Sequence, residues 1–223
     1  MRHLHALLLL IPCIAAAQSP APAPAAIQPI PWTAPAGATQ LWNGKDITGW
    51  TLFTSGSTPA PADFWSVAGD ALHFAGKPKG YLRTNKDYSN FHLHAEWRWL
   101  GQPKSGANNS GIFVFVRAPD ILWPYSIQVQ VKAGFSGDLL SQGGLLFPAP
   151  NPNPTMNKFH PDNEKAPGEW NGDDIYCRGS SVEVYVNNLR QNFVDKLPAD
   201  SGQIALQVEG YSIEFRNIWL ESL

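Results

Sequence analysis

Apolar and polar residues alternate with a period of two from Phe64 onward, in short segments separated by Gly, Pro, Asn and Asp. This alternation is typical of β-strands with one buried face, and no long segment has the 3.6-residue period of a helix. Turns are predicted at Gly179-Ser180 and at Gly210. The predicted strands span residues 64–68, 71–75, 80–84, 90–100, 111–118, 125–132, 143–147, 173–178, 181–187, 203–209 and 212–221. Such a chain is expected to form an all-β sandwich of two antiparallel sheets, of the jelly-roll type.

The strand within WPYSIQVQVKAGFSGD, residues 123–138, alternates most regularly. Its apolar residues Ile127, Val129 and Val131 should face the core, which places Gln128 and Gln130 on the opposite face. Solvent normally favours Lys, Thr or Glu at such positions rather than two successive glutamines. The glutamine face is therefore a candidate binding surface.

A second strand, FHLHAEWRW at residues 91–99, places His92, His94, Glu96 and Arg98 on one face. A His-x-His-x-Glu row could hold a metal ion, because alternate residues on a strand point the same way. The alternative is a convex, solvated face with one cross-strand ion pair. The metal hypothesis lacks a further ligand at recognisable spacing.

The N-terminal residues divide into two segments ahead of the predicted sandwich domain at 39–223. Residues 1–17 combine a basic start, an apolar run and Ala15 and Ala17 at A-x-A positions, which indicates a cleaved secretory signal. Residues 18–38, rich in Pro and Ala, should form an extended tether, with folding expected to begin near Leu41. The apolar run is too short to span a bilayer, so we expect a periplasmic or secreted protein.

Composition narrows the classes of partner. Cys177 is the only cysteine after the predicted cleavage site, so no internal disulfide is expected. The formal net charge of −2, without a basic cluster, argues against nucleic acid and anionic membrane surfaces. Nine Trp, six Tyr and eleven Phe could supply flat faces that stack on sugars, although many will lie in the core.

The connection at 148–170, PAPNPNPTMNKFHPDNEKAPGEW, is long for a sandwich. Loops of this length are often functional, and its charged and aromatic residues would suit a flap over a binding face. An irregular surface excursion is an equally open alternative.

Four motifs, together with the central SIQVQ and a Gly-Asp pair, resemble one family in order along the chain: LWNGKDITGW (41–50), NNSGIF (108–113), NEKAPGEWN (163–171) and GQIALQVEGYSIEFRNIWLESL (202–223). The family is named for 3-keto-disaccharide hydrolase, with 3-keto-glucoside 1,2-lyase and 3-keto-2-hydroxy-glucal hydratase activities. The resemblance covers essentially Leu41 to Leu223. It implies a concanavalin-like lectin/glucanase sandwich, export from a bacterial cell and a sugar oxidised at C3 as substrate.

The resemblance also implies candidate site residues. These are Asn109, Ser110, Gly111, Gln130, Asp138, Glu169, Trp170 and Asn171. Arg216 and Asn217 match the closing motif of the family, which is taken as mainly structural. Two positions depart from the family pattern. Gln128 stands where the family carries Glu, and Phe115 stands where Arg or His is common, so charge that serves the chemistry could be lost here.

A ketone at C3 acidifies the C2 proton, so elimination of the C1 substituent needs a base, a group that stabilises the enolate and an acid. We predict Glu169 or His160 for proton transfer. Substrate binding is predicted for Asn109, Gln128, Gln130, Asp138, Lys158, Glu164, Trp170 and Asn171, with Lys165 also available. A divalent cation could stabilise the enolate, although no spacing identifies its ligands.

Each candidate has a structural alternative. Glu169 to Asn171 could cap a turn and pack an indole, His160 could be a solvated loop residue, and Asn109 to Gly111 could form a turn.

The sequence leaves two functions open. The first is an exported enzyme that cleaves 3-keto-glucosides by elimination and hydration, and the second is a non-catalytic carbohydrate-binding module. A structural or interaction domain is a weaker third possibility.

Overall fold

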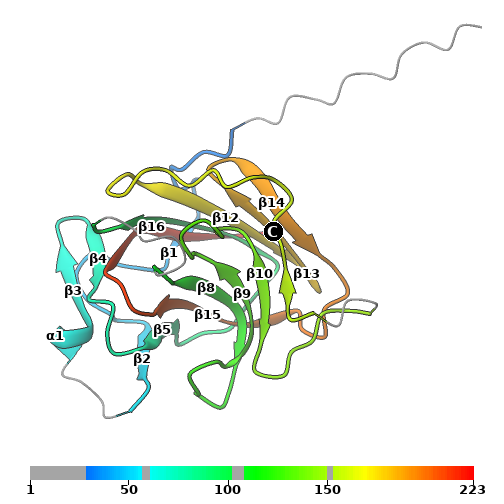
Figure 1. The fold of residues 1–223 in the computed structure, drawn as a ribbon, viewed down its shortest axis with the longest axis horizontal. Coiled ribbons are helices and arrows are strands. Elements are labelled where there is room, and N and C mark those ends of the chain that lie inside the picture. Colours follow the sequence, from blue (N-terminus) through cyan, green and yellow to red (C-terminus); the bar gives the residue numbers. More distant parts are fainter. Residues whose placement is uncertain (1–28, 57–60, 102–107, 150–152) are drawn as a thin grey trace, which may run out of the picture.

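The computed structural model describes residues 29–56, 61–101, 108–149 and 153–223, and these form two stacked antiparallel sheets (Figure 1). In spatial order sheet A contains β14 (Leu189–Val194), β13 (Ser181–Val186), β12 (Asn171–Arg178), β7 (Phe91–Trp99), β16 (Ile213–Ser222), β4 (Ala71–Phe74) and β3 (Trp65–Ala68), with β1 (Thr39–Gln40) paired to β16. Sheet B contains β11 (Thr155–Met156), β10 (Leu139–Gln142), β9 (Tyr125–Gln130), β8 (Gly111–Arg117), β15 (Ser201–Val208), β5 (Gly80–Thr84) and β2 (Trp50–Thr54), with β6 (Tyr88–Ser89) paired to β15. One short helix, α1 (Pro61–Phe64), precedes β3.

The two sheets enclose the apolar core. Alternation on β9 sends Ile127 and Val129 into the core, and alternation on β15 does the same for Ile204 and Leu206. The rings of Trp97 and other large aromatic residues fill the space between the sheets. The predicted all-β fold class is therefore confirmed, and each sheet keeps an outer face that carries the opposite set of side chains.

Most predicted strands lie where the alternation placed them, with boundaries that differ by at most two residues. The hairpin at Gly179-Ser180 joins β12 to β13 as predicted. The predicted strand at 143–147 is wrong, because those residues form a turn and a coil after β10. The sequence pattern did not predict β2, β10 or β14, nor the two-residue strands β1, β6 and β11.

Residues 29–38, placed by the sequence analysis in the tether, pack against the outer face of sheet A. The Trp32 carbonyl accepts hydrogen bonds from Asn217 Nδ2 at 2.6 Å and Trp219 Nε1 at 3.2 Å. The Trp32 ring lies against Gly172, where an added Cβ would come within 2.6 Å of it. Chain contacts with sheet A thus begin upstream of Leu41. Within the described residues no helix is long and apolar enough to cross a membrane.

Candidate functional site

The outer face of sheet B carries a continuous chain of side-chain amides, which we call the glutamine chain: Gln142, Gln128, Gln130 and Gln207. Gln142 Nε2 donates to Gln128 Oε1 at 2.9 Å. Gln128 Nε2 in turn donates to Gln130 Oε1 at 2.9 Å and to Gln207 Oε1 at 3.0 Å. Both atoms of the Gln128 amide are engaged, and the side chain is 2% exposed. Gln128 therefore orders its neighbours, and an amide cannot replace a carboxylate base.

The glutamine chain ends on a carboxylate, Glu209, which follows β15. Glu209 Oε2 accepts from Gln207 Nε2 at 3.1 Å and from Asn109 Nδ2 at 2.7 Å. Glu209 Oε1 lies 2.7 Å from the Lys79 ammonium. A carboxylate has about four lone-pair positions, and three are occupied here. Within the described residues one position on Oε1 has no partner, and the Glu209 side chain is 14% exposed.

The Asn-Ser-Gly motif builds this end of the sheet. Ser110 is fully buried and its hydroxyl donates to the Gln207 carbonyl at 2.7 Å, which joins β8 to β15. A Cβ at Gly111 would lie 2.7 Å from Gln128 Nε2, so glycine makes room for the amide. Asn109 is the member of the motif whose side chain contacts Glu209. The motif therefore combines one polar contact with two structural positions.

Phe115 occupies the position where the family pattern suggested Arg or His. The β8 strand is irregular there, with Phe115 at φ 60° and shifts in its register with both β9 and β15. The Phe115 ring lies in the core between the sheets, while Val116 packs on the outer face with Phe113 and Tyr81. A charged residue at 115 would need a different local backbone to reach the outer face.

Three of the predicted binding residues lie around the turn that follows β9, next to Gln130: Asp138, Lys158 and Glu164. Asp138 Oδ1 accepts from the Lys158 backbone N–H at 2.8 Å. Glu164 Oε2 accepts from the Gly134 N–H at 3.1 Å and from Ser136 Oγ at 3.3 Å. Burial raises the pKa of both carboxyl groups. These contacts attach the long 153–170 connection to sheet B.

The two residues predicted for proton transfer lie apart from the glutamine chain. Glu169 is exposed, and its Oε2 accepts from the Ala166 N–H at 3.2 Å within the same turn. His160 is also exposed, and its backbone N–H donates to Gln191 Oε1 at 3.2 Å. Within the described part of the chain, no hydrogen bond or ion pair links either side chain to Glu209 or the glutamine chain.

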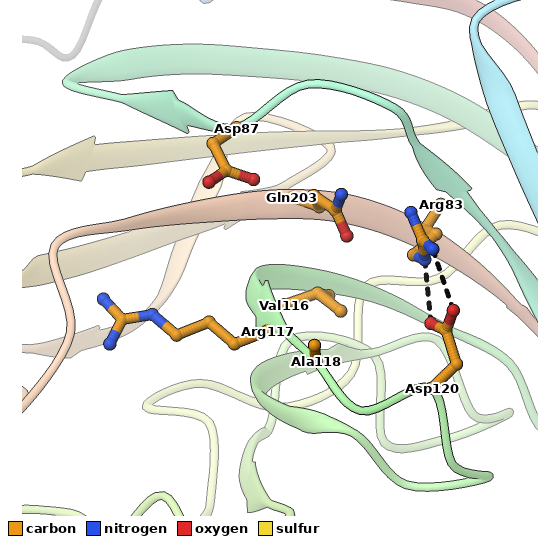
Figure 2. A pocket seen from close by; sticks show the side chains of 7 residues that line it. All are labelled: Arg83, Asp87, Val116, Arg117, Ala118, Asp120 and Gln203. Atoms are coloured by element: carbon orange, nitrogen blue, oxygen red, sulfur yellow. Dashed lines mark hydrogen bonds and ion pairs between the residues drawn. The ribbon is translucent and has the colours of Figure 1, made fainter.

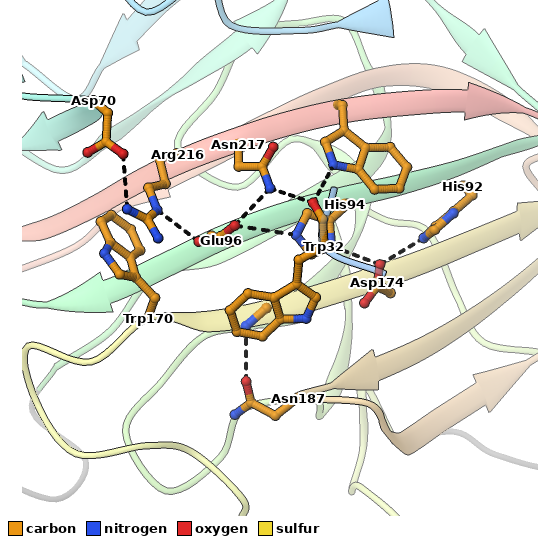
Figure 3. Close-up of polar contacts among 12 residues, drawn as sticks. Trp32, Asp70, His92, His94, Glu96, Trp170, Asp174, Asn187, Arg216 and Asn217 are labelled. Atoms are coloured by element: carbon orange, nitrogen blue, oxygen red, sulfur yellow. Dashed lines mark hydrogen bonds and ion pairs between the residues drawn. The ribbon is translucent and has the colours of Figure 1, made fainter. Parts of the chain in front are cut away.

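Trp170 lies on the outer face of sheet A (Figure 3), whereas Asn171 is on the inner face of β12, opposite the core residue Trp97 of β7. The Trp170 ring lies between two guanidinium groups, 4.5 Å from Arg98 and 4.0 Å from Arg216. Asn171 is 1% exposed, and its Oδ1 accepts from the Lys165 N–H at 2.8 Å. Trp170, on the outer face of sheet A, cannot share a binding surface with the glutamine chain on the outer face of sheet B, so the predicted substrate-binding residues do not all converge on one site.

The predicted solvated face around His92 and His94 is wrong, because both side chains are buried beneath other side chains. His92 Nε2 and His94 Nδ1 each lie 2.8 Å from Asp174 Oδ1 (Figure 3). Burial alone would raise the pKa of Asp174, but these two hydrogen bonds outweigh it and the pKa lies below its usual value. The carboxylate therefore accepts from both imidazoles.

Glu96 does not join the histidines in a metal site. Its carboxylate is bound by Arg216 Nε at 2.8 Å and by Asn217 Nδ2 at 2.7 Å. Among the residues that the structure describes, no group of three His, Cys, Asp or Glu side chains is arranged to hold a metal ion. The metal hypothesis for the His-x-His-x-Glu row is therefore wrong, and no residue is assigned to a divalent cation.

The sequence analysis missed Lys79, Gln207 and Glu209. A signal existed for two of them, because the alternation in IALQVEG places Gln207 and Glu209 opposite Ile204, Leu206 and Val208. Pairing of β8 with β15 then brings them beside Asn109 and Gly111. Lys79 lies in a Gly- and Pro-rich turn and carried no such signal.

The sequence matches the 3-keto-alpha-glucoside-1,2-lyase-like domain over residues 37–221. The chain belongs to this family. The family is carbohydrate-active, in agreement with the resemblance of the four sequence motifs. No curated relative matches the sequence.

Solved structures agree with the fold of this lyase-like domain. A candidate glycosyl hydrolase from Parabacteroides distasonis is 19% identical with a TM-score of 0.62, covering 84% of this chain and 94% of that one. The Bacillus licheniformis β-glucanase is 12% identical with a TM-score of 0.59, covering 84% of this chain and 99% of the glucanase. The carbohydrate-binding module CBM66 from Bacillus subtilis is 12% identical with a TM-score of 0.55, covering 78% and 96%. At these identities the likeness shows the concanavalin-like sandwich and nothing finer.

Proposed function

We propose that this lyase-like domain cleaves the glycosidic bond of 3-keto-glucosides by elimination, followed by addition of water. The observation that carries the proposal is Glu209, a partly exposed carboxylate with one free lone-pair position at the end of the glutamine chain. It replaces Glu169 and His160 as our candidate for proton transfer. Family membership supports this class of substrate.

Glu209 would remove the proton from C2, which the neighbouring C3 ketone acidifies. The electron pair first forms an enolate across C2 and C3, and then a double bond between C1 and C2 as the C1 oxygen leaves with a proton. Water adds to C1 and a proton returns to C2, so the net reaction is hydrolysis to 3-keto-glucose and an alcohol. The pathway differs from ordinary glycoside hydrolysis, which uses a pair of carboxylates.

Lys79 and Asn109 supply the charge and the hydrogen bonds that this elimination needs. The Lys79 ammonium is 2.7 Å from Glu209 Oε1 and has further N–H donors that could reach an enolate oxygen. Asn109 and Gln207 fix the orientation of the carboxylate, and Gln128 and Gln130 hold Gln207 in turn. The described side chains around Glu209 are one ammonium and the amides of Asn109 and Gln207, and the ammonium on the carboxylate disfavours a divalent cation at the same place.

The test compares two Glu→Gln variants of the purified domain, with release of the alcohol from a 3-keto aryl glucoside as the measurement. Glu209→Gln should lower turnover by a factor of about 100 or more, because general-base catalysis contributes that much. Glu169→Gln is the matched control and should retain turnover. Chelator and added divalent metal should leave both results unchanged.

The opposite pattern, with Glu169→Gln inactive and Glu209→Gln active, would remove Glu209 from the mechanism. No release by the unmodified domain, together with thermal stabilisation by sugars, would instead identify a carbohydrate-binding module. That is the alternative function that the glutamine chain could also serve.

A further inference from the structure

A polar hollow of about 260 Å³ lies on the outer face of sheet B, at the opposite end of β15 from Glu209 (Figure 2). It forms where β5, β8 and β15 meet the segment after β8. Its lining residues are Arg83, Asp87, Val116, Arg117, Ala118, Asp120 and Gln203. None of these takes part in the proposed elimination.

One wall of the hollow is rigid. Arg83 donates two parallel hydrogen bonds to Asp120, from Nε to Oδ1 and from Nη2 to Oδ2, each 2.8 Å long. The Tyr81 hydroxyl, on the buried side, donates to Asp120 Oδ1 at 3.1 Å. The hydrogen bond from Arg83 keeps the pKa of Asp120 below its usual value. The paired ions are thus held in place before any ligand binds, which lowers the entropic cost of binding.

The other walls carry free hydrogen-bonding groups. Within the described residues, neither the Gln203 amide nor the Asp87 carboxylate has a hydrogen-bond partner. The Arg117 guanidinium lies over the Tyr125 ring at 5.5 Å, and its side chain is 46% exposed. Within that part of the chain its one hydrogen bond, to the Ser201 carbonyl, is long at 3.3 Å, and its ion pair with Asp200 is at 4.0 Å. Donors and acceptors therefore both face the hollow.

The charges of the lining residues cancel, since Arg83 and Arg117 are balanced by Asp87 and Asp120, and Asp200 adds a further carboxylate 4.0 Å from Arg117. A phosphate or carboxylate would meet two aspartates, and a cation would meet two arginines. Hydroxyl groups both donate and accept, so they can pair with each of these side chains without a charge of their own. We infer that this hollow is a second carbohydrate site, which binds an uncharged sugar ring through its hydroxyl groups.

The position of the hollow bears on the length of the substrate. Gln203 and Glu209 are six residues apart along β15 and its extension, which corresponds to about 20 Å at the usual rise of a strand. Two sugar rings joined by one oxygen are shorter than this distance. On the basis of the proposed function, the inference extends the substrate class from disaccharides to longer oligosaccharides that contact both places.

The experiment measures binding of unoxidised tetrasaccharides, maltotetraose and cellotetraose, by chemical-shift titration of the ¹⁵N-labelled full domain. Arg117→Ala should weaken binding of the better tetrasaccharide by about tenfold or more, the usual effect of one hydrogen bond to a charged group, and Gln203→Ala, which removes a neutral amide, by about fivefold. Gln40→Ala on β1 and Arg178→Ala are matched controls. Arg178 also lies over a tyrosine ring, at 4.7 Å from Tyr176, but on sheet A. Both controls should bind as the unmodified domain does.

Failure of this inference is distinguishable from failure of the proposed function, because the probes cannot undergo elimination. No binding of either tetrasaccharide, or binding unchanged in both hollow variants, would overturn the second site whatever the turnover. Binding that is lost in Gln203→Ala and kept in Glu209→Gln would support the second site, even if no 3-keto-glucoside is cleaved.

Discussion

One missing methyl group, at Gly111, makes room for the glutamine chain. A side chain there would displace Gln128, which donates to both Gln130 and Gln207. Gln207 in turn holds Glu209. The sequence predicted that Gln128 and Gln130 share an outer face, since strand alternation is local. It could not show that their amides are saturated by one another, because that depends on pairing between strands far apart in the chain.

Asp173 is a carboxyl group buried in the core. It points from sheet A into the core, where its Oδ1 accepts from Trp97 Nε1 at 2.9 Å and its Oδ2 has no hydrogen-bond partner within the described residues. Burial raises the pKa of Asp173 from 3.8 to about 8, with Asp174 adding to the effect. The protonated acid is therefore the form that the core favours.

This shift predicts how stability depends on pH. The folded state holds the Asp173 proton up to a pH of about 8, whereas the unfolded state releases it near 3.8. Its contribution to the free energy of unfolding is thus complete below pH 3.8 and is lost as the pH rises toward 8. Asp173→Asn, neutral throughout, should gain stability relative to the unmodified domain across this window, as measured by urea unfolding at several pH values.

Asp195→Asn, at an exposed position, is the control for the Asp173 experiment and should follow the unmodified domain. An Asp173→Asn curve parallel to that of the unmodified domain between about pH 4 and pH 8 would contradict the assigned protonation state.

At the level of elements, alternation located strands with a simple pattern and failed where buried positions are polar. In β14 two of the three buried residues are polar, Gln191 and Asn192, and their side chains bind backbone carbonyls of neighbouring segments. A pattern that equates buried with apolar cannot recognise such a strand. β10 is only four residues long, and the apolar residues just after it favoured the wrong range, 143–147.

The segment at 29–38 behaves as an added element of sheet A, although its Pro and Ala content indicated a tether. Trp32 anchors it through its carbonyl bonds to Asn217 and Trp219 and through the ring, which lies 4.4 Å from the Lys165 ammonium. We expect Trp32→Ala to lower the free energy of unfolding by about 1–3 kcal/mol, because it removes a half-buried aromatic side chain. Urea unfolding measures the change.

Pro31→Ala, at an exposed neighbouring position, is the control and should change stability little. Turnover by Trp32→Ala should remain normal at temperatures where the variant is folded, because Trp32 and Glu209 lie on opposite outer faces of the sandwich. A loss of turnover without a loss of stability would contradict this separation.

For the whole molecule, the sequence predicted the sandwich, and the proposed site depends on how its two sheets are assembled.

Export remains a prediction that rests on residues 1–17, which lie outside the described residues. Expression of the full chain in a Gram-negative host should give a periplasmic protein whose intact mass begins at Gln18. Leu8→Lys combined with Leu9→Lys should leave an uncleaved precursor, whereas Ala25→Lys, beyond the cleavage site, should be processed normally. A cytoplasmic, full-length product of the unmodified gene would contradict the assignment.

The anchoring of Trp32 also sets the orientation of the molecule on any surface that holds its N-terminal end. Pro29 and Ile30, the first described residues, lie beside His92 and Tyr176 on the outer face of sheet A. Glu209 and the hollow at Arg83 belong to the outer face of sheet B. A domain held at Pro29 would therefore present the face that carries Glu209 and the hollow away from the point of attachment.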